Sequence, residues 1–176
     1  LETRNDVLVN GSSNYGIYDS IIIFSDYING EFLVFNKKGK IKNHFNNKGG
    51  SGEEYMSCLK FMYDEKAQEI FVLDDIRLHR ILVYSINGQF KRKLSLPKEC
   101  KLDQIIDIND SLFLAKRSEL YMRLDDKGFD YLLMSKKDAR TISALPISFL
   151  KRIYRVFTGI VDGKRGRYMT SPWDNI

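Results

Sequence analysis

The chain has 176 residues, of which 43% are hydrophobic and 29% charged, and its formal net charge is +5. These values are ordinary for one globular domain, and no apolar run approaches the roughly 18 residues of a membrane-spanning helix. No signal peptide is visible, and the two cysteines lack the spacing of a zinc site or a disulfide framework. Lysine and arginine are spread along the sequence without an RNA-binding signature, so nucleic acid is not the expected partner.

The first half of the chain contains two copies of one pattern. A shift of 49 residues brings residues 21–45 onto residues 70–94 without a gap and places Gly39 on Gly88. Each copy has a short apolar run, a turn with aspartate, a second apolar run, a glycine turn and a strand of alternating polarity. This order predicts antiparallel β-strands, and the Asn-Gly pair that ends at Gly88 is typical of a tight hairpin turn.

A third unit follows with weaker similarity. Its predicted strands cover residues 104–110, 111–115, 119–124 and 129–134. The stretch 135–150 does not fit the pattern and is expected to form a long connection. The predicted units are therefore residues 12–45, 57–96 and 103–134, followed by an incomplete unit over 150–176.

Four-stranded antiparallel units with a period of about 40–50 residues are typical of β-propeller blades. A sandwich of short strands is the alternative, but it gives no reason for the ungapped repeat. The expected fold class is therefore all-β, with about three propeller blades and part of a fourth. Closed propellers have four to eight blades, so we expect the remaining blades to come from a longer chain or, as the alternative, from a second copy.

Several stretches resemble the NHL-like six-bladed β-propeller proteins of the cell envelope of gut anaerobic bacteria, most of which have unknown function. LET at residues 1–3, with NDVLV after it, is similar to their opening strand. KGGSGEEY, with VFNKKGK upstream, resembles their link G-x-G-x-G-E-Y, although Ser51 stands where the family usually has proline. VLDDIRLHRILVYSINGQFKRKLSLP and GRYMTSPWDNI resemble later blades. The resemblance implies a location in the periplasm or on the cell surface, commonly with a lipid anchor, and no established catalytic residues.

The glycine-rich stretch NNKGGSGEEY, residues 46–55, raises the question of phosphate binding. A P-loop requires lysine and serine or threonine after its last glycine, whereas Glu53 and Glu54 follow here and would repel a phosphate. The two histidines, His44 and His79, lie in no context typical of a hydrolase or a zinc site. We therefore expect no cofactor and no metal, and interpret the stretch as a corner between blades whose glycines permit unusual backbone angles.

Blade geometry indicates where a binding site would lie. In an up-and-down blade, the link to the next blade shares a face with the loop between the second and third strands. Asp26 ends one such strand and is expected to accept backbone N–H groups in the turn. The candidate ligand-binding residues on this face are Glu53, Glu54, Tyr55, Tyr27, Arg77 and His79.

The leading hypothesis is a non-enzymatic propeller module of the cell envelope that binds a protein or a glycan. One alternative is a propeller enzyme, such as a lyase or hydrolase, whose catalytic groups lie partly outside this chain. The other is an RNA-binding propeller of the NHL type, which would use the basic surface and show a steep dependence of binding on salt.

Overall fold

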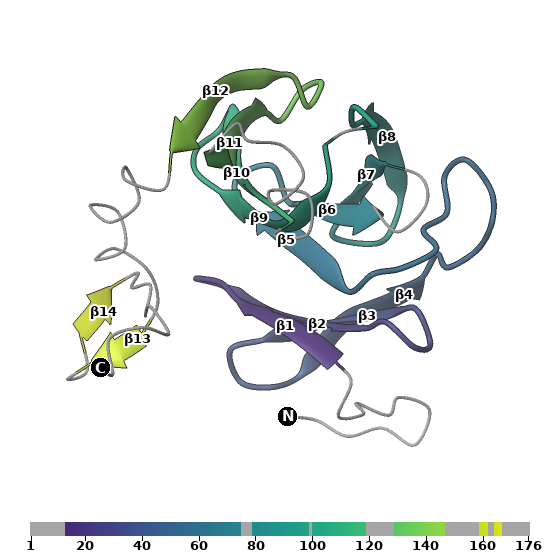
Figure 1. Cartoon of the computed structure of the whole chain (residues 1–176). Helices are drawn as coiled ribbons and strands as arrows, with labels where there is room; N and C mark the ends of the chain where they lie inside the picture. The colour runs from purple at the N-terminus through teal and green to yellow at the C-terminus, as the bar shows by residue number, and fades with distance from the viewer. Residues whose placement is uncertain are drawn as a thin grey trace.

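Figure 1 shows the computed structural model of the chain, in which three four-stranded antiparallel sheets form the main body. The structure describes residues 13–74, 79–98, 100–118, 129–146, 159–161 and 164–166. Within these ranges the regular structure is entirely β, and no helix has the length and apolarity needed to cross a membrane. The predicted all-β fold class is confirmed.

Each sheet is a simple meander in which consecutive strands pair, as the blades of a propeller require. The first sheet consists of β1 (Ser13–Ile17), β2 (Ile21–Asp26), β3 (Glu31–Asn36) and β4 (Ile41–Asn46). The second consists of β5 (Lys60–Asp64), β6 (Glu69–Asp74), β7 (Arg80–Ser85) and β8 (Phe90–Ser95). The third consists of β9 (Leu102–Asp107), β10 (Leu112–Arg117), β11 (Phe129–Ser135) and β12 (Thr141–Pro146). A separate antiparallel pair, β13 (Gly159–Val161) and β14 (Lys164–Gly166), lies within the predicted fourth unit.

The two copies of the sequence repeat form the same structure. Strands β3 and β7 occupy equivalent positions of the repeat, and so do β4 and β8. In both sheets the register shifts at the same point, after Val34 in one and after Val83 in the other. Gly39 and Gly88 have φ angles of 77° and 82°, which glycine adopts far more readily than other residues. The predicted hairpin turns are confirmed.

The third sheet begins as predicted but ends later. Residues 129–134, predicted as its last strand, lie in the third strand β11, and β12 follows it. The predicted connection over 135–150 is therefore wrong where it includes β12. This edge strand pairs on one side only, and Ile142 is 47% exposed, so its sequence carries little core pattern. The predicted strand 119–124 lies outside the described residues.

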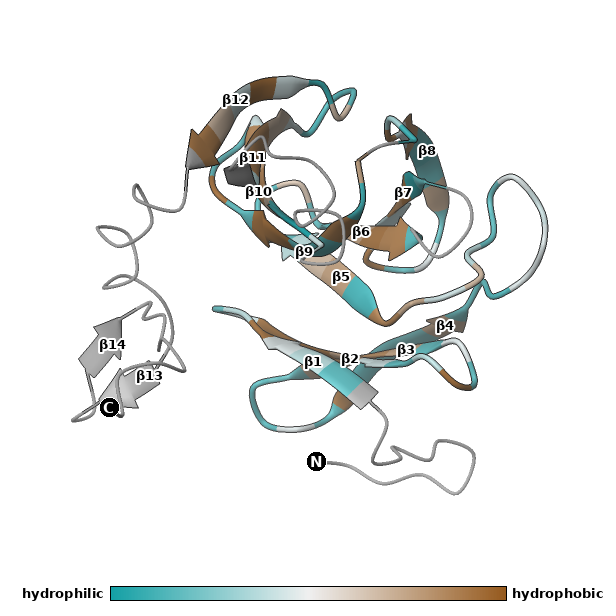
Figure 2. Cartoon of the chain, in the orientation of Figure 1, coloured by the Kyte–Doolittle hydropathy of each residue, from teal (hydrophilic) through white to brown (hydrophobic). Residues whose placement is uncertain are grey.

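The core lies between neighbouring sheets. Aromatic side chains are frequent in the cluster between the first two sheets, where Phe32, Tyr55 and Tyr84 are fully buried. Aliphatic and sulfur-containing side chains dominate the cluster between the second and third sheets, including Met62, Leu94 and Met134. Figure 2 shows apolar residues along the strands and a polar loop after β4. Because each sheet covers its neighbour, blade stacking holds the loops at both ends in fixed positions.

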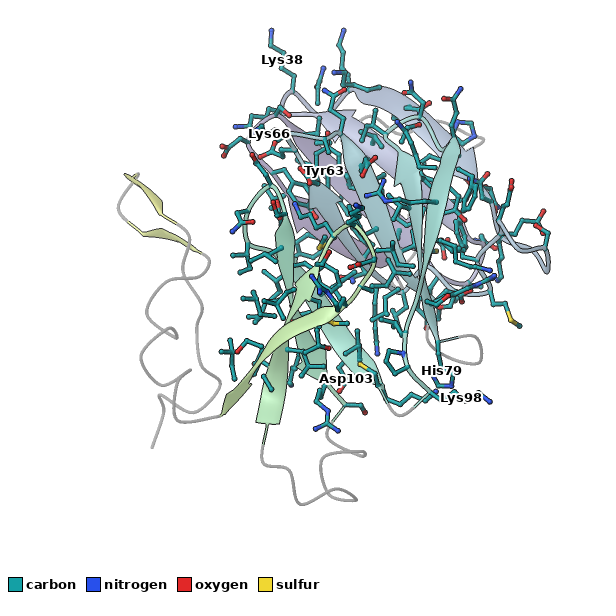
Figure 3. All side chains as sticks on the ribbon, turned by 90° about the horizontal axis from the view of Figure 1, so that it is seen from above. Lys38, Tyr63, Lys66, His79, Lys98 and Asp103 are labelled. Carbon is teal, nitrogen blue, oxygen red and sulfur yellow. The ribbon has the colours of Figure 1, made fainter. Side chains whose placement is uncertain are left out.

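The loops divide between two ends of the sheets. One end, here called the long-loop face, carries the loops between second and third strands and the links between blades. The other, the turn face, carries the remaining hairpin turns. Figure 3 shows His79 and Lys98 at the first end and Lys38 and Lys66 at the opposite end.

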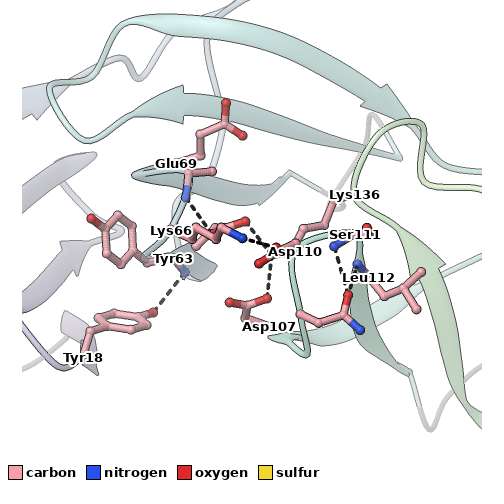
Figure 4. Close-up of polar contacts among 12 residues, drawn as sticks. Tyr18, Tyr63, Lys66, Glu69, Asp107, Asp110, Ser111, Leu112 and Lys136 are labelled. Atoms are coloured by element: carbon pink, nitrogen blue, oxygen red, sulfur yellow. Dashed lines mark hydrogen bonds and ion pairs between the residues drawn. The ribbon is translucent and has the colours of Figure 1, made fainter.

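A buried ion pair joins the second and third sheets at the turn face. The Nζ atom of Lys136 lies 2.5 Å from Oδ2 of Asp64 and 2.6 Å from Oδ1 of Asp107. The side chains of Lys136 and Asp64 are each 5% exposed. Figure 4 shows Lys136 and Asp107 beside the exposed pair of Lys66 and Asp110.

Candidate binding face

The stretch that links β4 to β5, residues 47–59, is the largest feature of the long-loop face, and it is called the corner below. The corner is closed by backbone hydrogen bonds. The N–H of Gly49 donates to the carbonyl of Tyr55 at 3.0 Å, and the N–H of Tyr55 donates to the carbonyl of Asn47 at 3.1 Å. Between them, the N–H of Ser51 donates to the Glu54 carboxylate at 2.8 Å. The corner is thus an ordered loop with its own hydrogen bonds.

Strand β7 of the second sheet holds the outer carbonyls of the corner. The guanidinium of Arg80 donates to the carbonyls of Gly52 at 3.1 Å and Glu54 at 2.6 Å. The hydroxyl of Tyr84 donates to the carbonyl of Glu53 at 2.5 Å. Three consecutive carbonyls are therefore held by side chains that come from the next blade, and this set of contacts is called the carbonyl clamp.

The charge of Arg80 is balanced beneath the corner. Its Nε donates to Oδ2 of Asp74 at 2.9 Å, and the two side chains are 8% and 1% exposed. The other oxygen of Asp74 accepts a hydrogen bond from the N–H of Met56 at 3.3 Å. Hydrogen bonds to charged groups are stronger than neutral ones, and the clamp therefore makes the corner a rigid part of the face.

Tyr55 is an anchor of the corner, and its side chain is fully buried. Its hydroxyl donates to the carbonyl of Gly30 at 2.7 Å and accepts the N–H of Asn47 at 2.9 Å. Its ring meets those of Phe32 and Tyr84 edge to face. Burial raises the pKa of the phenol well above its ordinary value. The side chain is enclosed by the protein, so its contribution to the face is to tie the corner to the β2–β3 loop.

The two glutamates of the corner differ in their surroundings. Glu53 is exposed, and only its backbone takes part in the clamp. Glu54 is half-buried, and the hydrogen bond from the backbone of Ser51 lowers the pKa of its carboxyl. Glu54 is therefore ionised at neutral pH but occupied in holding the corner, whereas Glu53 presents its carboxylate to solvent.

The remaining candidate residues are divided between the two neighbouring loops. Tyr27 is 38% exposed in the loop between β2 and β3. His79 is half-buried just before β7, with a φ of 43°, and its carbonyl accepts the N–H of Leu96 at 2.8 Å. Arg77 lies outside the described residues. The structure thus places Glu53 and Tyr27 as accessible side chains of one face.

The β2–β3 loop is held by the aspartate that the sequence singled out. Oδ1 of Asp26 accepts the N–H groups of Ile28 at 3.0 Å and Asn29 at 3.3 Å. This confirms the predicted role of Asp26 in the turn. Nζ of Lys48, from the corner, also donates to the carbonyl of Ile28 at 2.6 Å. The loop and the corner are therefore joined into one surface.

The three glycines of the corner do not use the positive φ angles that glycine permits. None of Gly49, Gly50 and Gly52 has a positive φ. A Cβ on Gly49 would lie 2.1 Å from a carboxylate oxygen of Glu54. A Cβ on Gly50 or on Gly52 would have no atom within 4 Å. Only Gly49 is thus constrained by packing, and its small size lets the Glu54 carboxylate reach the backbone.

Sequence reasoning missed the residues that hold the corner. Arg80 and Tyr84 belong to an apolar strand that reads RILVYS, and their partners lie about 30 residues upstream. An arginine at the head of a buried strand was the available signal, because buried arginines are rare unless they are paired. Exposed apolar residues of the face, Ile28, Met56 and Leu59, were also missed.

Comparison with known proteins points to one architecture. A family described as "6-bladed beta-propeller" matches residues 1–155. No curated protein matches the chain significantly. Among solved structures, a Bacteroides fragilis protein named "Putative exported protein" is similar at 21% identity and a TM-score of 0.63, covering 83% of this chain and 40% of its own.

Two further structures share the fold. A protein of unknown function from Bacteroides caccae has 10% identity and a TM-score of 0.56, covering 81% of this chain and 49% of its own. Glutaminyl cyclase from Myxococcus xanthus has 8% identity and a TM-score of 0.52, covering 81% of this chain and 59% of its own. The chain thus spans about two fifths to three fifths of the length of these structures, and the likeness is one of fold.

Proposed function

The chain belongs to the six-bladed β-propeller family whose model matches residues 1–155, and from this premise we propose that it is a non-enzymatic binding module. Its partner is a protein or a glycan of the cell envelope, and the contact is made by the long-loop face. The similarity to a protein named as exported supports the location. The remaining blades come from a longer chain or from a second copy.

The carbonyl clamp is the observation that carries this proposal. Arg80 and Tyr84 hold the corner from beneath, so the exposed carboxylate of Glu53 is presented by a backbone that is already ordered. Preorganisation of this kind strengthens binding because little conformational entropy is lost when the partner docks. Tyr27 lies on the neighbouring β2–β3 loop, which Asp26 fixes, and tyrosine is among the residues that most often dominate binding energy.

The enzyme alternative has no specific observation in its favour. The likeness to glutaminyl cyclase is a likeness of fold at 8% identity, and a fold alone does not assign an activity. Both glutamates of the corner have roles that suit a binding surface, since Glu54 supports the backbone and Glu53 faces solvent.

The test uses two defined probes: an array of bacterial and host glycans, and purified envelope proteins of a gut Bacteroides species. We expect saturable binding of the purified protein to one of them. Glu53→Ala and Tyr27→Ala should each weaken that binding at least 10-fold, because exposed anchor residues contribute about 1.4 kcal/mol or more.

Lys137→Ala, an exposed substitution in the β11–β12 turn, is the control and should leave affinity unchanged. Equal affinity of all three variants would overturn the assignment of the face. Turnover of a glycan on the array would establish the enzyme alternative, and tight binding to RNA with a steep salt dependence would establish the RNA-binding one.

A further inference from the structure

The outer strands of the first two blades share a pattern of exposed positive charge. In β4 the side chains of Lys42 and His44 are exposed, and Phe45 is buried. In β8 the equivalent positions hold Lys91 and Lys93, which are exposed, followed by buried Leu94. The turn before β4 adds three more exposed lysines. This surface is called the basic edge, and its lysines are Lys37, Lys38, Lys40, Lys42, Lys91 and Lys93.

The segments that form the basic edge contain no acidic residue, and the neighbouring carboxylates of Glu31 and Glu69 bond to Asn46 and Arg92. No aspartate or glutamate occurs in residues 37–48 or 85–98. None of its six lysines makes an ion pair within the described residues, whereas many basic residues elsewhere do. Those paired with carboxylates include Lys60, Lys66, Arg80, Arg92 and Lys136. Unpaired positive charge is therefore concentrated along this edge.

The two halves of the basic edge adjoin in space. Nδ2 of Asn43, on β4, donates to the carbonyl of Ile86 at 3.0 Å, and Nδ2 of Asn47 donates to the carbonyl of Gly88 at 2.6 Å. Gly88 also packs directly against the ring of Phe45. The outer strand of the first blade thus lies against the β7–β8 turn, which makes one continuous surface.

We propose that the basic edge docks on an anionic lipid surface and so orients the propeller edge-on. This inference goes beyond the proposed function because it concerns a surface distinct from the long-loop face. Clusters of four to eight basic residues are typical of attraction to anionic headgroups. Edge-on docking leaves the long-loop face open to a partner.

The choice of residue types favours a lipid surface over nucleic acid. All six charges are lysines, which act as hydrated point charges and suit a diffuse anionic surface, whereas bidentate recognition of one phosphate is typical of the forked guanidinium of arginine. Single-stranded nucleic acid also requires exposed aromatic rings for base stacking, and on β4 the aromatic residue Phe45 is buried. Lysines on an edge strand also prevent pairing with other sheets, but that role does not require Lys37, Lys38 and Lys40, which lie in the turn.

The test is co-sedimentation of the purified protein with vesicles of phosphatidylcholine containing about a third phosphatidylglycerol, at about 0.1 M salt. We expect binding that is absent with pure phosphatidylcholine. The triple variant K38Q/K40Q/K42Q should weaken partitioning by about 100-fold, since each lysine near an anionic surface contributes about a factor of five. These side chains make no hydrogen bond within the described residues, so the variant should fold normally.

The matched control is K98Q/K137Q/R140Q, which removes the same charge from exposed positions outside β4, β8 and the turn before β4. It should change partitioning by less than about threefold, because screening limits charges distant from the surface. Equal weakening by both triple variants would overturn the proposal, and so would failure of the unaltered protein to bind anionic vesicles. Tighter binding to single-stranded RNA than to vesicles at the same salt would also overturn it.

Discussion

The two junctions between neighbouring blades are built in different ways. The first and second blades are joined at the long-loop face by the corner, with Arg80 and Tyr84 bonded to backbone carbonyls. The second and third blades are joined by a shorter link, residues 96–101, in which Leu96 and Cys100 are buried. Their charged contact lies at the opposite, turn face, where Lys136 meets Asp64.

This difference teaches that the path of a large exposed loop is fixed by polar contacts to its backbone, whereas the shorter link buries two of its own apolar side chains. The corner exposes Glu53 and Met56 to solvent, so apolar burial alone cannot fix its path. Buried side chains instead bind its backbone, in keeping with the rule that buried polar groups are hydrogen-bonded. The corner is therefore an ordered loop although much of it is exposed, and the shorter link is fixed partly by burial of Leu96 and Cys100.

Arg80→Met should have the largest effect on stability. The substitution leaves Asp74 buried without its partner, and removal of one member of a buried ion pair costs about 3–5 kcal/mol. It also leaves the carbonyls of Gly52 and Glu54 without their donor. We expect the free energy of unfolding, measured by urea denaturation, to fall by about 4 kcal/mol.

Arg92→Met is the matched control for this variant. Arg92 pairs with Glu69, but the Arg92 side chain is 35% exposed. Its substitution should therefore lower the free energy of unfolding by only about 1 kcal/mol. A similar loss in both variants would show that the carbonyl clamp adds nothing to an ordinary ion pair. Loss of glycan or protein binding in the Arg80 variant, at temperatures where it remains folded, would show that the carbonyl clamp supports the binding face.

Lys136→Met should have the second largest effect, and it tests the other junction. Burial raises the pKa of Asp64, but hydrogen bonds from Ala67 N–H and Lys136 outweigh it, so the net pKa of the carboxyl is lowered. This contribution to stability is present at neutral pH and is lost as pH falls below about 4, where the unfolded carboxyl is protonated. We expect a loss of about 3 kcal/mol at pH 7.

The pH dependence of this variant provides the control. Without Lys136, burial of Asp64 is less opposed, so its carboxyl should take up a proton more readily in the folded state. The difference in unfolding free energy between the two proteins should therefore shrink as pH falls from 7 to about 4. A difference that stays constant over this range would contradict an electrostatic origin.

Tyr55→Phe should have an intermediate effect that is confined to the first junction. The substitution keeps the ring contacts but removes the hydroxyl that joins Gly30 to Asn47. Because the Gly30 carbonyl and the Asn47 N–H lose their partner, the free energy of unfolding should fall by about 2 kcal/mol. Tyr27→Phe, on the exposed loop, should change the unfolding free energy by less than about 0.5 kcal/mol. Equal values for the two variants would mean that Tyr55 does not anchor the corner.

Much of the fold could be predicted from the sequence, but the support of the corner could not. The repeat located β3, β4, β7 and β8 because their hydrophobic patterns are local. Strand β12 was missed because an edge strand with an exposed Ile142 has no clear pattern. The burial of Tyr55 depends on Phe32 and Tyr84, which are distant in sequence. Single-sequence patterns do not report such long-range contacts, so the tyrosine was grouped with exposed residues.

The smallest predicted effect concerns the glycines of the corner. Gly50→Ala should be tolerated, because its φ is not positive and a Cβ there meets nothing within 4 Å. It should stabilise the protein by about 0.5 kcal/mol by restricting the unfolded chain. Gly30→Ala, in the loop that Tyr55 anchors, is the contrast. The φ of Gly30 is 83°, and the new Cβ would lie 2.5 Å from Cβ of Lys48. The free energy of unfolding of this variant should therefore fall by about 2 kcal/mol.

Thermal or urea unfolding of these two variants separates two explanations for the glycine-rich stretch. If the corner needs glycine for its path, both variants should lose stability. If the path is set by the carbonyl clamp, only Gly30→Ala should do so. A gain of stability in the Gly50→Ala variant, with binding retained, would mean that neither the fold nor the binding face requires glycine at this position. Loss of binding with stability unchanged would instead show that a bare backbone at Gly50 is needed for close approach of the partner.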